Sequence, residues 1–207
     1  MNVIDDFWQS TERLPEPMWA SWQDRQRTQI LTALSCIPPF RSVYELGCGA
    51  GPNLRRILHV RPGVIVGGSE PNENLAAWAS EHLGVPIDRN ELPHAPGPSW
   101  DVTFSCYAMA YVDEPIVRQT MENVRSRVFI ILEPTAGVVP FGAPGAYTEG
   151  GEPTCVPCYV HDYLGLAELT GWRVLWRWPL YPHHQGLNVV LTLERSEERR
   201  VGKECRL

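Results

Sequence analysis

The sequence predicts an α/β fold whose sheet is doubly wound and mostly parallel, with helices on both faces. From about residue 41 onward, short apolar runs alternate with segments of helical periodicity, which is typical of parallel strands joined by crossover helices. Two later apolar runs, over residues 172–181 and 187–194, are joined by the turn PHHQG, which predicts a C-terminal antiparallel hairpin. A chain of 207 residues is long enough for one domain with a sizeable core.

The first two units of this pattern are each a strand, a turn and a helix. Residues 42–46 predict the first strand, and apolar residues then recur at helical spacing behind Pro52, a residue that suits a first helical turn. Residues 63–70 predict the second strand. The helix after it should end at Gly84, because glycine readily adopts the left-handed conformation that closes a helix.

Three further strands should complete the parallel part of the sheet. They are a short strand at 85–88, a buried strand at 101–106, and a fifth strand at 127–132 that follows another helix. The pattern then breaks, because ten of the 25 residues from 134 to 158 are glycine or proline. This composition predicts a long loop, which is either a lid or substrate surface or a plain surface loop.

The two ends of the chain are less regular. A helix over residues 161–170 leads into the hairpin, where alternation places Trp172 and Trp176 on one face. Residues 1–40 predict an N-terminal helical cap. Three tryptophans in it either pack a cap helix on the sheet or cover a ligand as a lid: Trp8, Trp19 and Trp22.

The last residues have a foreign composition. The stretch RSEERRVGKECR (195–206) resembles the translated read-through of a common sequencing adapter. The only lysine of the chain is Lys203, so the first 194 residues use arginine for every side-chain cation. We therefore assign residues 195–207 to an artefactual tail, expect it to be frayed, and exclude it from the fold.

The composition excludes some classes of function. Setting aside the tail's five basic and three acidic side chains leaves 13 of the 18 basic and 21 of the 24 acidic ones, a formal charge of −8. An acidic body without clustered cations argues against a nucleic-acid partner. No apolar run is long enough to span a membrane, and the start MNVIDDFWQS lacks the basic-then-apolar pattern of a signal peptide. The odd number of body cysteines favours reduced thiols. We expect a cytoplasmic protein.

A glycine-rich turn separates the first strand from its helix. The segment ELGCGAG places Gly47, Gly49 and Gly51 where backbone N–H groups at a helix start can face a carboxylate or a phosphate. A tight strand-to-helix turn also needs glycine without any ligand. A dinucleotide fingerprint would require a third glycine where this chain has Pro52, so a nicotinamide cofactor fits poorly.

The same segment resembles the first motif of the class I S-adenosylmethionine-dependent methyltransferases. The resemblance continues in order over about residues 40–194, through DVTFSCYAMAYVDEP at the fourth strand and ILEP at the fifth. It implies a methyltransferase domain over 41–194 with a Rossmann-like, seven-stranded sheet, whose last strand is inserted antiparallel between the fifth and the sixth. It also implies S-adenosyl-L-methionine as the cofactor.

Two acids carry the implied cofactor contacts. Glu70 ends the second strand, 19 residues after Gly51, and an acid there binds the ribose hydroxyls in this family. Asp88 begins the segment D-x-x-x-L-P, similar to the family segment whose acid meets the adenine amino group. The residues expected at the cofactor are Glu45, Gly47, Cys48, Gly49, Gly51, Glu70, Pro71, Asp88, Ser105 and Cys106.

The resemblance does not name the methyl acceptor. Many relatives have histidine after the fourth strand where this chain has Ala110 and Tyr111, and the loop after Glu133 carries no family motif. We expect a small-molecule acceptor such as a sugar, a lipid or a secondary metabolite. Three histidines are either the catalytic base or simply exposed or capping residues: His161, His183 and His184. Tyr111 either orients the acceptor or packs in the protein interior.

Three questions stay open at the level of sequence. Cys155 and Cys158 have three interpretations: thiols without a role, half of a zinc site, or a redox pair. We assign no metal site, because a structural zinc needs four ligands and His161 would supply only the third. The domain could bind the cofactor without catalysis and serve as a scaffold, or be a nucleotide-binding oxidoreductase. The sequence indicates no oligomeric state.

Overall fold

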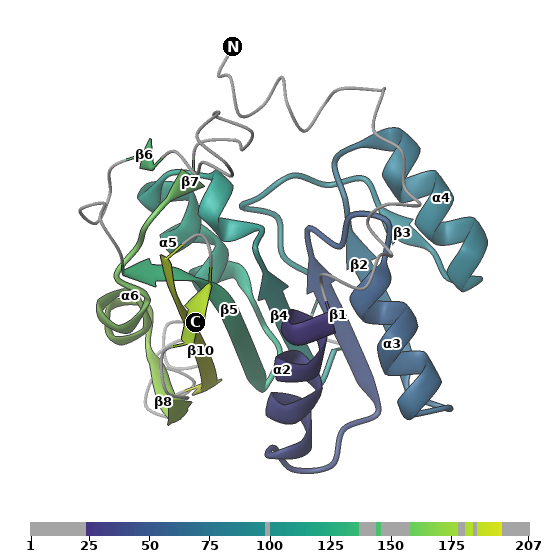
Figure 1. Cartoon of the computed structure of the whole chain (residues 1–207), viewed down its shortest axis with the longest axis horizontal. Coiled ribbons are helices and arrows are strands. Elements are labelled where there is room, and N and C mark those ends of the chain that lie inside the picture. The colour runs from purple at the N-terminus through teal and green to yellow at the C-terminus, as the bar shows by residue number, and fades with distance from the viewer. Residues whose placement is uncertain are drawn as a thin grey trace, which may run out of the picture.

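The computed structural model describes residues 24–97, 100–136, 144–145, 158–177, 181–183 and 186–195. A single twisted sheet runs through the centre of this part of the chain, with helices in front of it and behind it (Figure 1). The strands of the sheet are β1 (Ser42–Leu46), β2 (Ile65–Ser69), β3 (Ile87–Asp88), β4 (Val102–Cys106), β5 (Val128–Ala136), β8 (Trp172–Arg177), β9 (Tyr181–His183) and β10 (Gly186–Arg195). A separate short pair joins β6 (Pro144–Gly145) to β7 (Cys158–Tyr159).

The order of the strands confirms the predicted sheet. Seven strands follow the order β3-β2-β1-β4-β5-β10-β8, and the short β9 pairs with β10 beside this path. Strands β1 to β5 pair in parallel, whereas β10 runs antiparallel to both β5 and β8. The chain steps outward from β1 to β3 and then returns to β4 on the other side of β1. Ligands of such sheets bind at this reversal, beyond the carboxyl ends of the strands.

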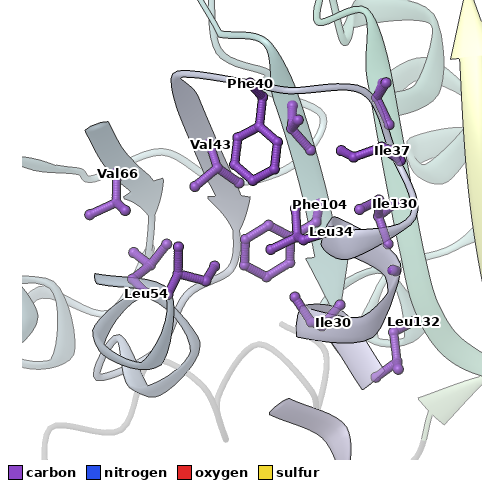
Figure 2. Packing of buried hydrophobic residues seen from close by; sticks show 14 of the residues in the cluster. Ile30, Leu34, Ile37, Phe40, Val43, Leu54, Val66, Phe104, Ile130 and Leu132 are labelled. Carbon is purple, nitrogen blue, oxygen red and sulfur yellow. The ribbon is translucent and has the colours of Figure 1, made fainter. Parts of the chain in front are cut away.

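Helices cover both faces of the sheet. The described helices are α2 (Asp24–Ser35), α3 (Pro52–Val60), α4 (Glu73–Leu83), α5 (Glu114–Asn123), α6 (Tyr163–Leu169) and the 3-10 turn η3 (Met109–Tyr111). On one face, α2 and α3 contribute Ile30, Leu34 and Leu54 to a buried cluster with strand residues such as Val43 and Phe104 (Figure 2). On the other face, α5 and α6 pack against β1, β5 and β10. Burial of these apolar faces fixes the layers.

Local signals set the ends of two helices beside the sheet reversal. The side chain of Asn72 accepts hydrogen bonds from the backbone N–H groups of Asn74 and Leu75, which starts α4. Gly84 closes α4 with φ of 67°, as the sequence predicted. Pro52 occupies the first turn of α3, directly after Gly51.

Parts of the predicted cap, loop and tail lie outside the described residues. Helix α2 is the described part of the N-terminal cap, and the three N-terminal tryptophans precede it. Strand β5 continues through Pro134 to Ala136, so the long loop begins later than predicted. No described helix has the length and apolar content that crossing a bilayer requires.

Arg195, the first residue of the predicted tail, is the last residue of β10. Its guanidinium lies 4.4 Å from the ring centroid of Trp172 and donates to the backbone carbonyls of Thr170, Glu122 and Val124. Arg195→Ala should therefore lower the free energy of unfolding by about 1–2 kcal/mol.

The measurement is urea unfolding, and the control is a second arginine at the same edge of the sheet. Arg173 forms an exposed ion pair with Glu194, so Arg173→Ala should cost less than about 1 kcal/mol. Equal losses in the two variants would show that Arg195 contributes no more than a surface charge. Residues 196–207 lie outside the described residues, and the tail stays a prediction.

Candidate active site

The glycine turn joins β1 to α3 at the reversal of the sheet. Gly47, Gly49 and Gly51 all have left-handed backbones, with φ of 65°, 56° and 80°. A methyl group added at Gly47 would lie 2.5 Å from Cβ of Ala108, and one added at Gly51 would lie 2.6 Å from Cδ1 of Leu83. Gly47 therefore needs glycine both for conformation and for space, whereas at Gly51 the flexible end of Leu83 can move and the conformation is the main requirement.

Glu70 lies against this turn. It follows β2 and is 5% exposed, and its Oε2 accepts a hydrogen bond from the backbone N–H of Gly49 at 2.8 Å. Its Oε1 accepts from the backbone N–H of Asn72 at 2.9 Å. These two bonds orient the Glu70 carboxylate against the turn. The structure thus brings the predicted acid and the glycine turn together.

Asp88 ends the neighbouring strand at the same edge of the sheet. It pairs with Ser69 in the register of β2 and β3, and its backbone carbonyl accepts from the N–H of Glu70 at 2.9 Å. Its exposed carboxylate accepts from the hydroxyl of Tyr44 at 2.7 Å. Burial, followed by the Asp88 carboxylate, raises the pKa of Tyr44, so the tyrosine stays a donor. Glu70 and Asp88 therefore lie at the ends of neighbouring strands, at one edge of the sheet.

Two further predicted residues brace the turn. Glu45 is 1% exposed and accepts from the side-chain amide of Asn53 at 2.6 Å, which ties β1 to the first turn of α3. The backbone N–H of Cys48 donates to the carbonyl of Ser69 at 2.8 Å, which ties the turn to β2. Burial, then the nearby Glu45 and Glu70 carboxylates, raise the pKa of the Cys48 thiol, so it is not a thiolate nucleophile. Pro71 is half-buried beside Glu70.

A buried carboxylate of β5, that of Glu133, lies against the end of β4. Ser105 is fully buried and its hydroxyl donates to Oε1 of Glu133 at 2.6 Å, while Cys106 is half-buried at the strand end. Oε1 of Glu133 also accepts from the backbone N–H groups of Ala108 and Met109, at 3.0 and 3.1 Å. Oε2 accepts from the N–H of Ala110 at 3.2 Å. The signal available in the sequence was an acid at the end of an apolar strand.

Residues 107–112, which we call the β4 turn, begin with a residue in a strained conformation. Tyr107 continues the pairing with β5 through its backbone N–H, which donates to the carbonyl of Leu132 at 3.0 Å. Its φ of 59° then reverses the chain. A left-handed tyrosine costs about 1–3 kcal/mol. The hydrogen bonds to Glu133 offset this cost.

Glu133 should make stability depend on pH. Burial raises its pKa from 4.5 to about 7, and the hydrogen bonds from Ser105 and the turn oppose that rise only in part. A carboxyl whose folded pKa exceeds its unfolded pKa binds more protons when folded, so its contribution to stability falls as pH rises from about 4.5 to about 7. The slope attributable to Glu133 reaches at most about −1.4 kcal/mol per pH unit.

Urea unfolding of the wild type and of Glu133→Gln across that pH range measures this contribution. The variant lacks the titrating group, so its stability should fall less steeply with pH than that of the wild type. Parallel pH profiles would show that Glu133 has the same pKa in the folded and unfolded states.

His161 is the catalytic candidate that the structure describes in full. It is completely buried, its Nε2 lies 3.0 Å from the carbonyl oxygen of Val112, and its ring lies near those of Tyr159 and Tyr163. Burial lowers the pKa of His161 below 6.5, which favours the neutral ring. With the proton on Nε2, Nδ1 carries a lone pair, and among the described residues this buried atom has no hydrogen-bond partner.

The remaining candidates are described only in part. Tyr111 is half-buried at the end of η3, next to the residue that contacts His161. His183 belongs to β9, but its side chain and the whole of His184 lie outside the described residues, as does Cys155. Cys158 is described only as backbone of β7. Within the described residues no group of histidine, cysteine and acidic side chains could hold a metal ion.

Solved structures with the same architecture exist, although no protein-family model and no curated protein matches the chain. Magnesium protoporphyrin IX methyltransferase (ChlM) from Synechocystis PCC 6803 with bound SAH is 13% identical, with a TM-score of 0.61 over 93% of both chains. The sugar N-methyltransferase KedS8 from Streptoalloteichus sp ATCC 53650 is 15% identical, with a TM-score of 0.61 over 94% of this chain and 93% of KedS8. The [4+2]-cyclase SpnF is 14% identical, with a TM-score of 0.63 over 89% and 86%. At these identities the likeness concerns architecture, and the chain has the Rossmann-like fold of methyltransferases.

Proposed function

We propose that the protein transfers a methyl group from S-adenosyl-L-methionine to a small molecule. The observation that carries the proposal is the buried Glu70 carboxylate, hydrogen-bonded to the Gly49 amide at the reversal of the sheet. An acid at this place can accept two hydrogen bonds from a ribose diol. The bound SAH in ChlM, a protein of the same fold, supports the choice of cofactor.

Each end of the cofactor has a matching group. The glycine turn would face its amino-acid carboxylate at Gly47, while Gly51 shapes the turn through its N–H, which donates to the carbonyl of Cys48. Glu70 would bind the ribose, and Asp88, one strand further out, would accept from the adenine amino group. Glu45, Cys48 and Pro71 would hold the shape of the turn, and Ser105 and Cys106 would line the end of β4.

The chemistry asks little of the protein beyond alignment. Methyl transfer from a sulfonium is an in-line displacement with an activated leaving group, and alignment is worth about 7–11 kcal/mol. A base adds typically 10²–10⁴-fold where the acceptor must lose a proton. The neutral His161, with the lone pair on Nδ1, is the first candidate for the base. Tyr111 directly precedes Val112, whose carbonyl contacts His161, and we assign to it the orientation of the acceptor. His183 and His184 remain alternative bases.

The proposed acceptor class is a sugar, a lipid or a secondary metabolite. A sugar N-methyltransferase and a porphyrin methyltransferase share the fold, which supports a small molecule. The [4+2]-cyclase SpnF also shares it, so the fold by itself does not decide the reaction. A domain that binds the cofactor without transferring methyl groups is therefore the second candidate.

A screen of small-molecule acceptors that reads out S-adenosylhomocysteine release tests the proposal. We expect turnover with at least one acceptor, and a loss of 10²–10⁴-fold in kcat for His161→Ala at saturating acceptor. The exposed His59 on α3 provides the control, and His59→Ala should keep the wild-type rate. An unchanged rate in His161→Ala would remove the base role. Cofactor binding without turnover of any acceptor would favour the second candidate.

A further inference from the structure

The β4 turn is held at both of its ends by side chains from other elements. At its start, Glu133 of β5 accepts hydrogen bonds from three consecutive backbone N–H groups, those of residues 108, 109 and 110. At its end, the carbonyl of Val112 lies 3.0 Å from Nε2 of His161, which stands just before α6. Two long-range contacts therefore fix the turn in addition to its own backbone hydrogen bonds, from Tyr111 to Ala108 and from Val112 to Met109.

The contact at the start of the turn presents three backbone N–H donors to Glu133, whose carboxyl is mostly ionised above its pKa of about 7. Successive backbone N–H groups that converge on one point favour a negative charge there. The described partners of the Glu133 carboxylate are these amides and the Ser105 hydroxyl, and none of them carries a charge. A neutral side chain at this position cannot satisfy the same donors equally, because an amide group replaces one acceptor oxygen with a donor.

The turn also contacts both parts of the proposed active site. Ala108 lies so close to Gly47 that a single added methyl group would collide with it at 2.5 Å. Four residues later, Val112 orients the ring of His161. A displacement of the turn would therefore reach the cofactor turn on one side and the acceptor side on the other.

We propose that Glu133 is a positioning residue, which sets the β4 turn against Gly47 by binding the amides of residues 108–110 and so shapes the cofactor site. The inference rests on the proposed function, because it assumes that the cofactor occupies the space beside Gly47. It assigns to Glu133 no contact with either reactant. Binding of the cofactor and the hydrogen-bonded position of the β4 turn are then linked, so each stabilises the other.

The test combines hydrogen exchange with calorimetry on the full chain. In Glu133→Gln, the backbone amides of 108–110 should exchange at least tenfold faster than in the wild type, and the Kd for S-adenosylhomocysteine should rise at least tenfold. Saturating S-adenosylhomocysteine should restore much of the lost protection in the variant. A merely structural role of Glu133 would instead lower the protection of amides throughout the sheet, whereas the proposed role confines the loss to the β4 turn. Glu168→Gln, at an exposed acid of α6, should leave both measurements unchanged.

Glu133→Asp provides a second variant if Glu133→Gln does not fold. Aspartate keeps the carboxylate on a side chain that is one methylene shorter. The increases in amide exchange and in Kd should therefore have the same direction and be smaller. Faster exchange with an unchanged Kd, in either variant, would overturn the inference. A wild type that binds no S-adenosylhomocysteine would refute the proposed function, and an unprotected 108–110 segment in the wild type would refute the anchoring of the turn.

Discussion

Gly47→Ala is expected to weaken binding of S-adenosylhomocysteine by at least a hundredfold, whereas Gly84→Ala leaves it unchanged. The two glycines have nearly the same backbone conformation, with φ of 65° and 67°. They differ in their surroundings, since a methyl group at Gly47 would lie 2.5 Å from Cβ of Ala108 and one at Gly84 would meet nothing within 4 Å. The comparison therefore separates the clash from the backbone strain.

The free energy of unfolding should also fall further in Gly47→Ala than in Gly84→Ala. Each alanine in the left-handed region costs about 1–2 kcal/mol, and overpacking adds about 1–3 kcal/mol at Gly47 only. Urea unfolding measures these losses, and calorimetric titration measures the affinity of the folded protein. If Gly47→Ala and Gly84→Ala bind the ligand equally well, the turn at Gly47 does not form a wall of the site.

Glu70→Gln should weaken the same ligand by about a hundredfold. Each hydrogen bond to a charged acceptor contributes about 1.5–3 kcal/mol, and the loss of two such bonds to a ribose diol, at the lower limit, corresponds to roughly 3 kcal/mol. The variant keeps the volume of the side chain but replaces one acceptor oxygen with a donor, so it also weakens the contact of residue 70 with the amide of Gly49 or of Asn72. The affinity for S-adenosylhomocysteine, measured by calorimetry, checks the prediction.

Glu73→Gln is the matched control, because Glu73 lies three positions further along the chain. Its side chain is 70% exposed and pairs with Arg89 at 2.8 Å, an interaction worth little at the surface. We expect wild-type affinity for this variant. Equal affinities of Glu70→Gln and Glu73→Gln would place the ribose elsewhere.

The positions of the glycine turn, Glu70 and Asp88 could be predicted because their signals are local. Three glycines within five residues specify left-handed positions in a turn, and Glu70 and Asp88 each directly end a predicted strand. Parallel strands bring their carboxyl ends to one edge of the sheet, so the position of each acid follows once the strands are recognised.

The β4 turn could not be predicted, because its contacts join distant residues. Glu133 binds partners 23 to 28 positions earlier in the chain, and His161 contacts Val112 across 49 positions. Neither pairing leaves a spacing that a sequence pattern would reveal. Only the order of the strands in the sheet brings the ends of β4 and β5 together.

The hairpin shows how a local rule can be overridden. Alternation placed Trp172 and Trp176 on one face, yet Trp172 is 4% exposed and Trp176 is 55% exposed. The pairing of β8 with β10 shifts register between Thr192 and Leu193, and such a bulge changes which residues share a face. Arg195 was likewise assigned to a tail on composition, although β10 extends to include it.

Calorimetric titration of the full chain with S-adenosylhomocysteine and, separately, with NAD tests the central claim most directly. The claim is that the glycine turn, Glu70 and Asp88 together form a site for a methyl-donor nucleoside. It predicts saturable binding of S-adenosylhomocysteine at about one molecule per chain and no binding of NAD. A folded protein that binds NAD and gives no heat with S-adenosylhomocysteine would contradict it.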